Sequence, residues 1–129
     1  MSVDEAIAAY CEAIAAYCAA WNESDPVKRD QMLEPVWAED ATYTDPTVHT
    51  VGRAALVAHI STVCARFPGS TIVLTSGIDI HHNLLRFYWK RLLADGTSRP
   101  EGIDFGEIAD DGKIRRIVGF FGPLERRSL

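Results

Sequence analysis

Cysteine is scarce in this chain, and an odd count of three among 129 residues argues against a framework of disulfide bonds. Cys11 and Cys18 are seven residues apart, which is about 10 Å along a helix axis and too far for a disulfide. We therefore predict that these two residues and Cys64 are buried free thiols that pack in the core, in a protein from a reducing compartment.

Long hydrophobic runs and an excess of positive charge are also absent. No apolar run approaches the roughly 20 residues of a membrane span, and the N-terminal residues are acidic where a signal peptide would be basic. The 13 basic residues are mostly scattered and are outnumbered by 18 acidic residues, for a net charge of -5. We therefore expect a cytoplasmic protein whose partners include neither nucleic acid nor a membrane.

The sequence does contain enough apolar material for a core, because 47% of its residues are hydrophobic. It has no linker and no low-complexity segment. Both features predict a single domain over residues 1–129 that folds without disulfide bonds.

The chain opens with a repeat, in which EAIAAYC occupies residues 5–11 and again residues 12–18. Its apolar residues, continued by Trp21, fall on one stripe of an amphipathic helix. The pattern stops after two heptads, at the helix-breaking segment 22–26, so a coiled coil is not expected. We predict a helix that packs against the core.

Two further helices and a series of strands follow. A second helix starts at Asp25-Pro26 and presents a short apolar face that includes Val36 and Trp37, and a third runs from about Arg53 to Phe67. Strands are predicted over residues 41–44, 70–80, 84–93, 98–108 and 113–121. Helices first and strands last argue for an α+β domain, with the helices on one face of a curved, mostly antiparallel sheet and a concave ligand pocket between them.

Four motifs, in this order, carry a resemblance to a known family. They are Trp37-Ala-Glu-Asp-Ala-Thr-Tyr-Thr-Asp-Pro, Gly52-Arg-Ala-Ala-Leu, Phe67-Pro-Gly and Asp111-Gly-Lys-Ile. The chain resembles the nuclear transport factor 2-like superfamily, in particular its SnoaL-like and ketosteroid isomerase-like branch, from about residue 6 to residue 122. The resemblance implies the cone-shaped fold of that superfamily, with three N-terminal helices packed on the sheet.

The resemblance also implies three catalytic residues. Ketosteroid isomerases remove a proton beside a ketone with an aspartate that precedes a proline, while a tyrosine of the first helix and a protonated strand aspartate hold the enolate oxygen. By local motif, Tyr17 looks like the tyrosine, Asp45 like the base and Asp104 like the protonated acid. The chemistry needs no cofactor.

The residue types suit these tasks on physical grounds as well. Proline fixes the backbone beside Asp45, so its carboxylate is positioned to act as a general base. A buried Asp104, in a strand with glycines at 102 and 106, would have a raised pKa and would donate a hydrogen bond, and Tyr17 would add a second donor.

Each of these residues also has a structural interpretation. Asp45-Pro46 is an ordinary turn opening, and a tyrosine on an apolar helical stripe, such as Tyr17, is usually a core residue. Asp104 would pair with a nearby arginine, for which the candidates are Arg86, Arg99 and Arg116.

The side chains that line the predicted pocket are identified by their place in the sequence and by the alternation of side chains between the two faces of a strand. In the strand Arg86-Phe-Tyr-Trp-Lys, Phe87 and Trp89 share one face, whereas Arg86 and Tyr88 share the other, which is a surface or dimer contact. The predicted substrate-binding residues are Trp21, Trp37, Tyr43, His49, Phe87, Trp89, Ile117 and Phe121. No metal site is expected, because the adjacent His81 and His82 point to opposite faces of a strand.

The expected function is proton transfer, as isomerisation or cyclisation through an enolate, on a small apolar carbonyl compound in a homodimeric enzyme. The chain departs from the isomerase pattern by a longer segment at residues 23–29 and by a polar loop at residues 47–50, so the substrate need not be a steroid. Two alternatives remain. One is a hydrolase or dehydratase in which Asp104 and an arginine or histidine activate water, and the other is a non-catalytic module that binds a small ligand or a protein.

Overall fold

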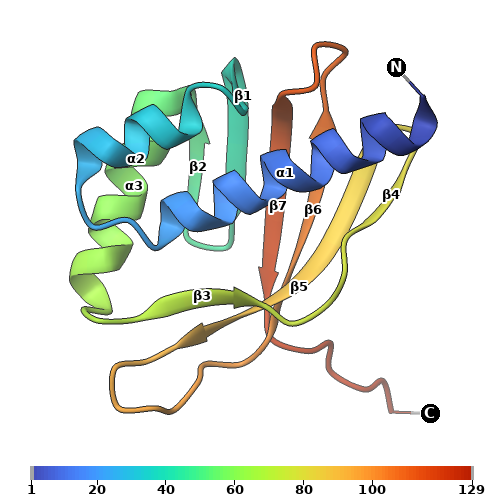
Figure 1. The fold of residues 1–129 in the computed structure, drawn as a ribbon. Coiled ribbons are helices and arrows are strands. Elements are labelled where there is room, and N and C mark those ends of the chain that lie inside the picture. The colour runs from blue at the N-terminus through green and yellow to red at the C-terminus, as the bar shows by residue number, and fades with distance from the viewer. Residues whose placement is uncertain (1, 129) are drawn as a thin grey trace.

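A computed structural model describes residues 2–128 of the chain (Figure 1). The helices are α1 (Val3–Trp21), α2 (Pro26–Leu33) and α3 (Arg53–Arg66). The strands are β1 (Trp37–Asp45), β2 (Val48–Val51), β3 (Thr71–Leu74), β4 (Asp79–His81), β5 (Leu84–Leu92), β6 (Gly102–Ile108) and β7 (Ile114–Phe121). Among the helices described, none is long and apolar enough to span a membrane.

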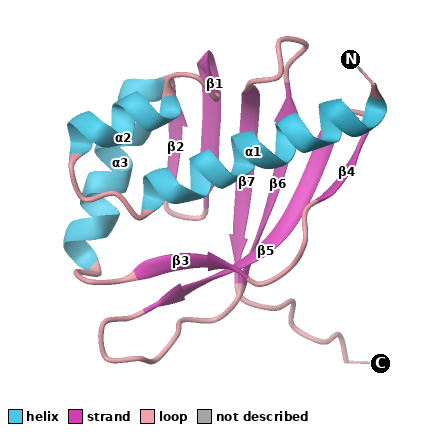
Figure 2. Cartoon of the chain, viewed as in Figure 1, coloured by secondary structure: helices cyan, strands magenta, loops and turns pink. Residues whose placement is uncertain are grey.

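The seven strands form one curved, open sheet with the order β2-β1-β7-β6-β5-β3, and β4 pairs with part of β5. Strands β1 and β7 run parallel, and the other pairings are antiparallel. The three helices cover the sheet, with α1 lying across β7 and β6 (Figures 1 and 2). The predicted α+β class and the mostly antiparallel sheet under three helices are therefore confirmed.

The two copies of the N-terminal repeat have different environments along α1. Ser2 begins the helix, because its Oγ accepts a hydrogen bond from the Glu5 amide at 3.1 Å. Ile7 of the first copy is 40% exposed, whereas the corresponding Ile14 of the second copy is completely buried. Tyr17 is buried as well, so the second copy, together with Trp21, supplies the core face of α1.

Several predicted boundaries were wrong, for identifiable reasons. Helix α2 ends at Leu33 rather than including Val36 and Trp37, because Pro35 cannot continue the helical hydrogen bonding. Trp37 instead begins β1, which is nine residues long, and the segment expected as a polar loop is strand β2, paired with β1 in a hairpin.

The expected strand over residues 70–80 is divided into β3 and β4. At the break, Ser76 Oγ accepts the hydrogen bond of the Tyr88 amide at 2.7 Å, so a side chain replaces the backbone partner. Beyond the break, pairing with β5 resumes at Asp79, where β4 begins.

All three cysteines are free, as predicted, but only Cys18 is buried. Cys11 belongs to the partly exposed first copy of the repeat, and Cys64 is also partly exposed on α3. Burial raises the pKa of the Cys18 thiol to about 12, and the charge of Asp104 adds to the effect.

Two polar side chains fix the helical layer. The completely buried Arg29 of α2 donates to Val57 O at 3.1 Å and to Ser61 Oγ at 2.6 Å, both on α3. At the end of α1, Asn22 exchanges two hydrogen bonds with the backbone of Ile72 on β3, at 2.6 and 2.9 Å. The helices are thereby held at a set position relative to the edge of the sheet.

Candidate active site

A cavity of about 320 Å³ lies between the helical layer and the concave face of the sheet. The structure brings all three predicted catalytic residues, Tyr17, Asp45 and Asp104, to its walls. Five of the predicted substrate-binding residues also line it, namely Trp21, Tyr43, Phe87, Trp89 and Phe121. The predicted alternation in β5 is confirmed, since Phe87 is 2% exposed and Tyr88 is 47% exposed.

Three predicted wall residues do not line the cavity. Trp37 lies in the core behind Tyr17, with the two rings stacked at a centroid distance of 5.6 Å. Ile117 is completely buried on β7, and its side chain lies beside Gly106. His49 lies on the hairpin strand β2, where its Nδ1 is 2.7 Å from Thr44 Oγ1, so it packs on the hairpin and not in the cavity.

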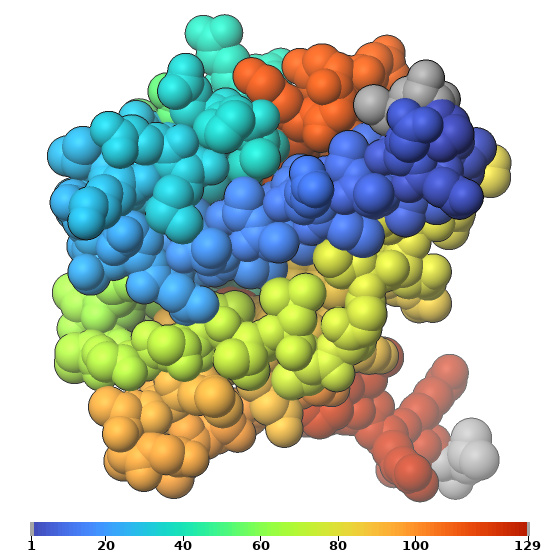
Figure 3. Space-filling model, viewed as in Figure 1, coloured from blue at the N-terminus to red at the C-terminus, as the bar shows by residue number. Residues whose placement is uncertain are grey.

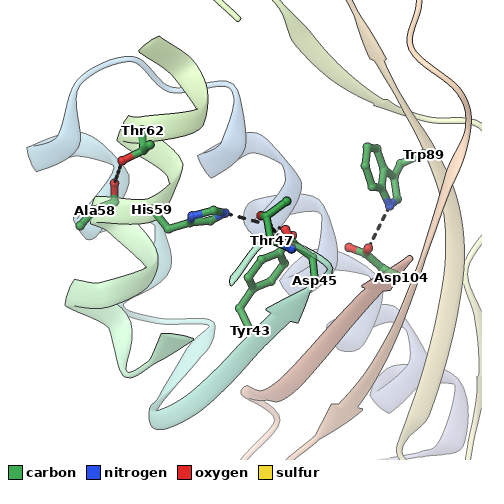
Figure 4. Close-up of polar contacts among 8 residues, drawn as sticks. All are labelled: Tyr43, Asp45, Thr47, Ala58, His59, Thr62, Trp89 and Asp104. Carbon is green, nitrogen blue, oxygen red and sulfur yellow. Dashed lines mark hydrogen bonds and ion pairs between the residues drawn. The ribbon is translucent and has the colours of Figure 1, made fainter. Parts of the chain in front are cut away.

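Asp104 is a buried carboxyl group without a cation beside it. It is 5% exposed on β6, opposite Phe87 of β5, and its Oδ1 accepts a hydrogen bond from Trp89 Nε1 at 2.9 Å (Figure 4). Within residues 2–128 it makes no ion pair, so the predicted alternative of an arginine partner is wrong. Burial raises the pKa of Asp104 to about 7, against the opposing effect of the Trp89 hydrogen bond and with a contribution from the charge of Asp45.

Glycines at two positions make room for this arrangement. A Cβ atom at Gly119, which pairs with Asp104 across the sheet, would lie 2.9 Å from Asp104 Oδ1 and 3.7 Å from Asp45 Cβ. A Cβ atom at Gly102 would overlap the ring of Trp89. The absence of side chains at these two positions lets the indole lie across the sheet and leaves Asp45 and Asp104 on either side of Gly119.

Asp45, at the end of β1, is surrounded by hydrogen-bond donors. Its Oδ2 accepts from the Tyr43 hydroxyl at 2.6 Å, and its Oδ1 accepts from the Thr47 amide at 2.7 Å and from the Thr47 hydroxyl at 2.6 Å (Figure 4). His59 Nε2 lies 3.8 Å from Oδ2, which is within ion-pair distance when the imidazole carries a charge. Burial alone would raise the pKa of Asp45, but His59, Thr47 and Tyr43 outweigh burial and hold it well below its ordinary value.

Tyr17 presents an unpaired hydroxyl group. The residue is 1% exposed on α1, and among the described residues its Oη has no hydrogen-bond partner. Burial, together with the charge of Asp104, raises the pKa of Tyr17 well above its ordinary value, so the hydroxyl keeps its proton. A buried donor without an acceptor is costly, and an oxygen atom of a ligand in the cavity would satisfy it.

Several residues of the cavity wall were not predicted from the sequence. Arg91 follows Phe87 and Trp89 on the same face of β5, so the alternation that identified those two would also have identified Arg91. Thr47 follows Asp45 by two residues, which is the spacing of a turn closed by an aspartate side chain. Arg66, Phe67 and Arg99 come from the end of α3 and from the loop after β5, and no pattern in the sequence places them together.

The cavity thus holds an ionised carboxylate, a carboxyl group whose pKa is raised to about 7 and a hydroxyl donor without a partner among the described residues. Within residues 2–128, no cluster of three or more His, Cys, Asp or Glu side chains forms a potential metal site. These groups are suited to moving a proton at a bound organic molecule.

Replacing Asp104 tests its burial through protein stability. The native protein holds the Asp104 proton more tightly than the unfolded chain does, so wild-type stability should fall as pH rises from about 4 to about 7. Asp104→Asn, which keeps an oxygen for Trp89, should remove this loss and have a higher Tm than wild type at about pH 8. Thermal unfolding at several pH values measures this difference in Tm. The exposed Asp110→Asn is the control, and an equal increase in Tm in that variant would contradict the assignment to Asp104.

The model of the SnoaL-like domain matches residues 14–117. A proposed isomerase of the SnoaL-like family from Agrobacterium tumefaciens shares 32% sequence identity and superposes with a TM-score of 0.84, covering 90% of this chain and 99% of that chain. No curated protein matches the sequence.

More distant structures share the fold alone. A hypothetical protein with a ketosteroid isomerase-like fold from Catenulispora acidiphila, in complex with trimethylamine, is 14% identical with a TM-score of 0.69, covering 86% of this chain and 85% of that chain. A proposed SnoaL-like polyketide cyclase from Jannaschia is 9% identical with a TM-score of 0.63, covering 84% and 83%. The family model and the Agrobacterium relative agree over most of the chain, and they confirm the resemblance read from the sequence. The chain belongs to the SnoaL-like domain family, within the nuclear transport factor 2-like fold.

Proposed function

We propose that this protein is a small-molecule enzyme that transfers a proton on an apolar carbonyl compound through an enolate, in an isomerisation or a cyclisation. One observation carries the proposal: Asp45 and Asp104 line the same cavity, and their surroundings shift their pKa values in opposite directions. When two carboxyl groups have pKa values shifted apart, the one with the low pKa acts as the base and the one with the high pKa acts as the acid.

The proton follows a simple path in this scheme. The ionised Asp45 removes a proton from the carbon next to the carbonyl group, and the electron pair of the broken C–H bond moves onto the carbonyl oxygen. Tyr17 and the protonated Asp104 donate hydrogen bonds to that oxygen as its negative charge develops. Because the Trp89 indole donates to Oδ1 of Asp104, Oδ2 is the oxygen that carries the proton. In an isomerisation, Asp45 returns the proton to another carbon as the carbonyl group forms again. In a cyclisation, the enolate carbon bonds to a second carbonyl carbon, and the oxygen of that carbonyl takes the proton from Asp45. Neither path consumes a cofactor.

The hydrogen bonds around Asp45 restrict the range of substrates. Tyr43 and Thr47 hold the carboxylate in place, but they also make it a weak base, because a proton must compete with their three hydrogen bonds. A weak base removes a proton efficiently only from an acidic carbon. We therefore propose a substrate whose reacting carbon lies between two carbonyl groups. A proposed polyketide cyclase among the structural neighbours agrees with this type of chemistry.

The pKa of Asp104 also supports a second candidate function. At a pKa of about 7, an appreciable fraction of Asp104 is ionised at neutral pH, and an ionised Asp104 would activate water for hydrolysis or assist a dehydration. A non-catalytic module that binds a small ligand remains the third interpretation. The complex of one structural neighbour with trimethylamine agrees with binding of a small molecule in this fold.

Binding of an enolate mimic tests the enolate site. β-Naphthol, a planar phenol, should bind more tightly than the ketone β-tetralone, because both donors prefer an oxygen with anionic character. Tyr17→Phe should weaken β-naphthol binding by about 1 to 3 kcal/mol, through loss of one buried hydrogen bond. Asp45→Asn should preserve or strengthen binding, because it removes a negative charge beside the ligand.

Calorimetry measures these affinities. Tyr10→Phe is the matched control, since Tyr10 has the corresponding position in the first repeat and bonds Asn83 outside the cavity. Equal binding of phenol and ketone, unchanged by Tyr17→Phe, would exclude the enolate site and favour a binding module.

The pH dependence of α-proton exchange separates the enolate mechanism from the hydrolase. In D2O, enzyme-dependent deuterium incorporation into a planar diketone should fall as pH rises through about 7, because Asp104 loses the proton that it donates. Asp104→Asn should retain exchange and lose this decline, whereas Asp45→Asn should abolish exchange. If Asp104 is instead a base for water, hydrolytic activity should rise through the same pH range and Asp104→Asn should be inactive.

We also propose that two chains associate through the outer face of the sheet. Tyr88, Phe105 and Phe120 on β5, β6 and β7 are 47%, 41% and 53% exposed, and the rings of Phe105 and Phe120 are 6.2 Å apart. Apolar surface of this kind, on adjacent strands, is typical of a symmetric interface. Sedimentation should give a dimer that Phe120→Asp dissociates, and a strict monomer at micromolar concentration would contradict the interface.

A further inference from the structure

Three arginine side chains gather around one aromatic ring at the rim of the cavity. The guanidinium carbons of Arg66, Arg91 and Arg99 lie 5.6, 5.3 and 5.1 Å from the centre of the Phe67 ring. They come from the end of α3, from β5 and from the loop that follows β5, and these segments meet at the bottom of the molecule in Figures 1 and 3. All four residues line the cavity.

None of the three arginines has an acidic partner within residues 2–128. Arg66 and Arg99 are exposed and solvated, but Arg91 is only 7% exposed. Its one hydrogen bond to a side chain goes to Ser70 Oγ, at 2.9 Å. A guanidinium group has five donors, so most of those on Arg91 are available to a ligand in the cavity, beside two further positive charges.

Arg29 shows how the same fold surrounds the two terminal nitrogens of a buried arginine with acceptors. Its guanidinium group donates to the backbone oxygens of Glu23 and Val57 and to the Ser61 hydroxyl, and it does not line the cavity. Within residues 2–128 Arg91 has no such set of acceptors, and it lines the cavity. The missing acceptors of Arg91 are therefore expected on a ligand.

The arginines are separated from the carboxyl groups along the sheet. Arg91 follows Phe87 by four residues on β5, and Phe87 pairs with Asp104. Along an extended strand, Cα atoms four residues apart are separated by about 13 Å. One end of the cavity thus carries the Asp45 and Asp104 carboxyl groups, and the other end carries the positive charge.

We propose that the ligand of this cavity carries an anionic oxygen group, a carboxylate or a phosphate, which Arg91 binds with the support of Arg66 and Arg99. The reacting carbonyl group lies at the opposite end of the ligand, beside Tyr17 and Asp104. The placement of the carbonyl rests on the proposed function, whereas the anion site rests on the arginines alone. The planar fork of a guanidinium group matches the two oxygens of such an anion, and a buried site strengthens the pair.

Calorimetry with three probes tests the anion site. The probes are β-naphthol, the same compound with a carboxylate at the far end of its second ring, and the same compound with a phosphate there. Each anionic probe should bind about tenfold or more tightly than β-naphthol at low salt, and added salt should reduce the advantage. The probe with the larger gain identifies the anion as carboxylate or phosphate.

Substitutions on β5 show whether Arg91 causes the tighter binding of the anionic probes. Arg91→Met should abolish the advantage of the anionic probes and leave β-naphthol binding unchanged. Arg86→Met is the matched control, because Arg86 lies on the same strand but on the outer face, paired with Asp79, and this variant should preserve both affinities. Equal affinity for neutral and anionic probes would overturn the proposal. The proposal would also be overturned if Arg91→Met bound β-naphthol itself much more weakly than wild type does, since that result indicates a structural role for Arg91.

A naphthoate without the hydroxyl group keeps this test independent of the proposed function. It should bind more tightly than naphthalene methanol, and the gain should depend on Arg91, even if β-naphthol proves no better a ligand than β-tetralone. Failure of the naphthoate with success of β-naphthol would remove the anion site and leave the enolate mechanism intact.

Discussion

Burial of the Asp104 carboxyl group beside Trp89, away from any cation, is the constraint on which the candidate site depends. A carboxylate in this position would face a large desolvation penalty, so the group keeps its proton up to a pH of about 7. Only in that protonated form does it donate a hydrogen bond to a ligand oxygen. Tyr17, whose hydroxyl has no partner in the described structure, supplies a second donor in the same cavity. The polar groups of the site are thus prepared for an acceptor with developing negative charge.

The fold separates charges that would otherwise cancel. Asp45 remains ionised because His59, Thr47 and Tyr43 lower its pKa, and Gly119 leaves room for it between β1 and Asp104. Arg91 lies about four residues further along β5, so the cluster of arginines does not neutralise Asp104. An arginine beside Asp104 would lower its pKa and remove the donor. In the proposed scheme, the distance between the two ends serves both the proton transfer and the orientation of a charged ligand.

The fold class could be predicted from the sequence because its signals are local, and the three central residues could be located because the motifs around them resemble a known family. Helical periodicity, proline and glycine breaks and short motifs around Tyr17, Asp45 and Asp104 each lie within a few neighbouring residues. The errors came from long-range packing. Trp37 and Ile117 are apolar residues like those of the wall, and only the three-dimensional packing places them in the core behind it. The arginine cluster was missed because Phe67 collects side chains from three separate segments.

Carbon-13 NMR of the aspartate side chains measures the protonation state of Asp104 directly. In protein labelled at the aspartate carboxyl carbon, with Asp104→Asn used to assign the signal, Asp104 should titrate near pH 7. Asp45 should remain ionised to well below the ordinary aspartate value. A signal of Asp104 that titrates near the ordinary value of about 4 would contradict the account, because the site would then hold two carboxylates and no acid.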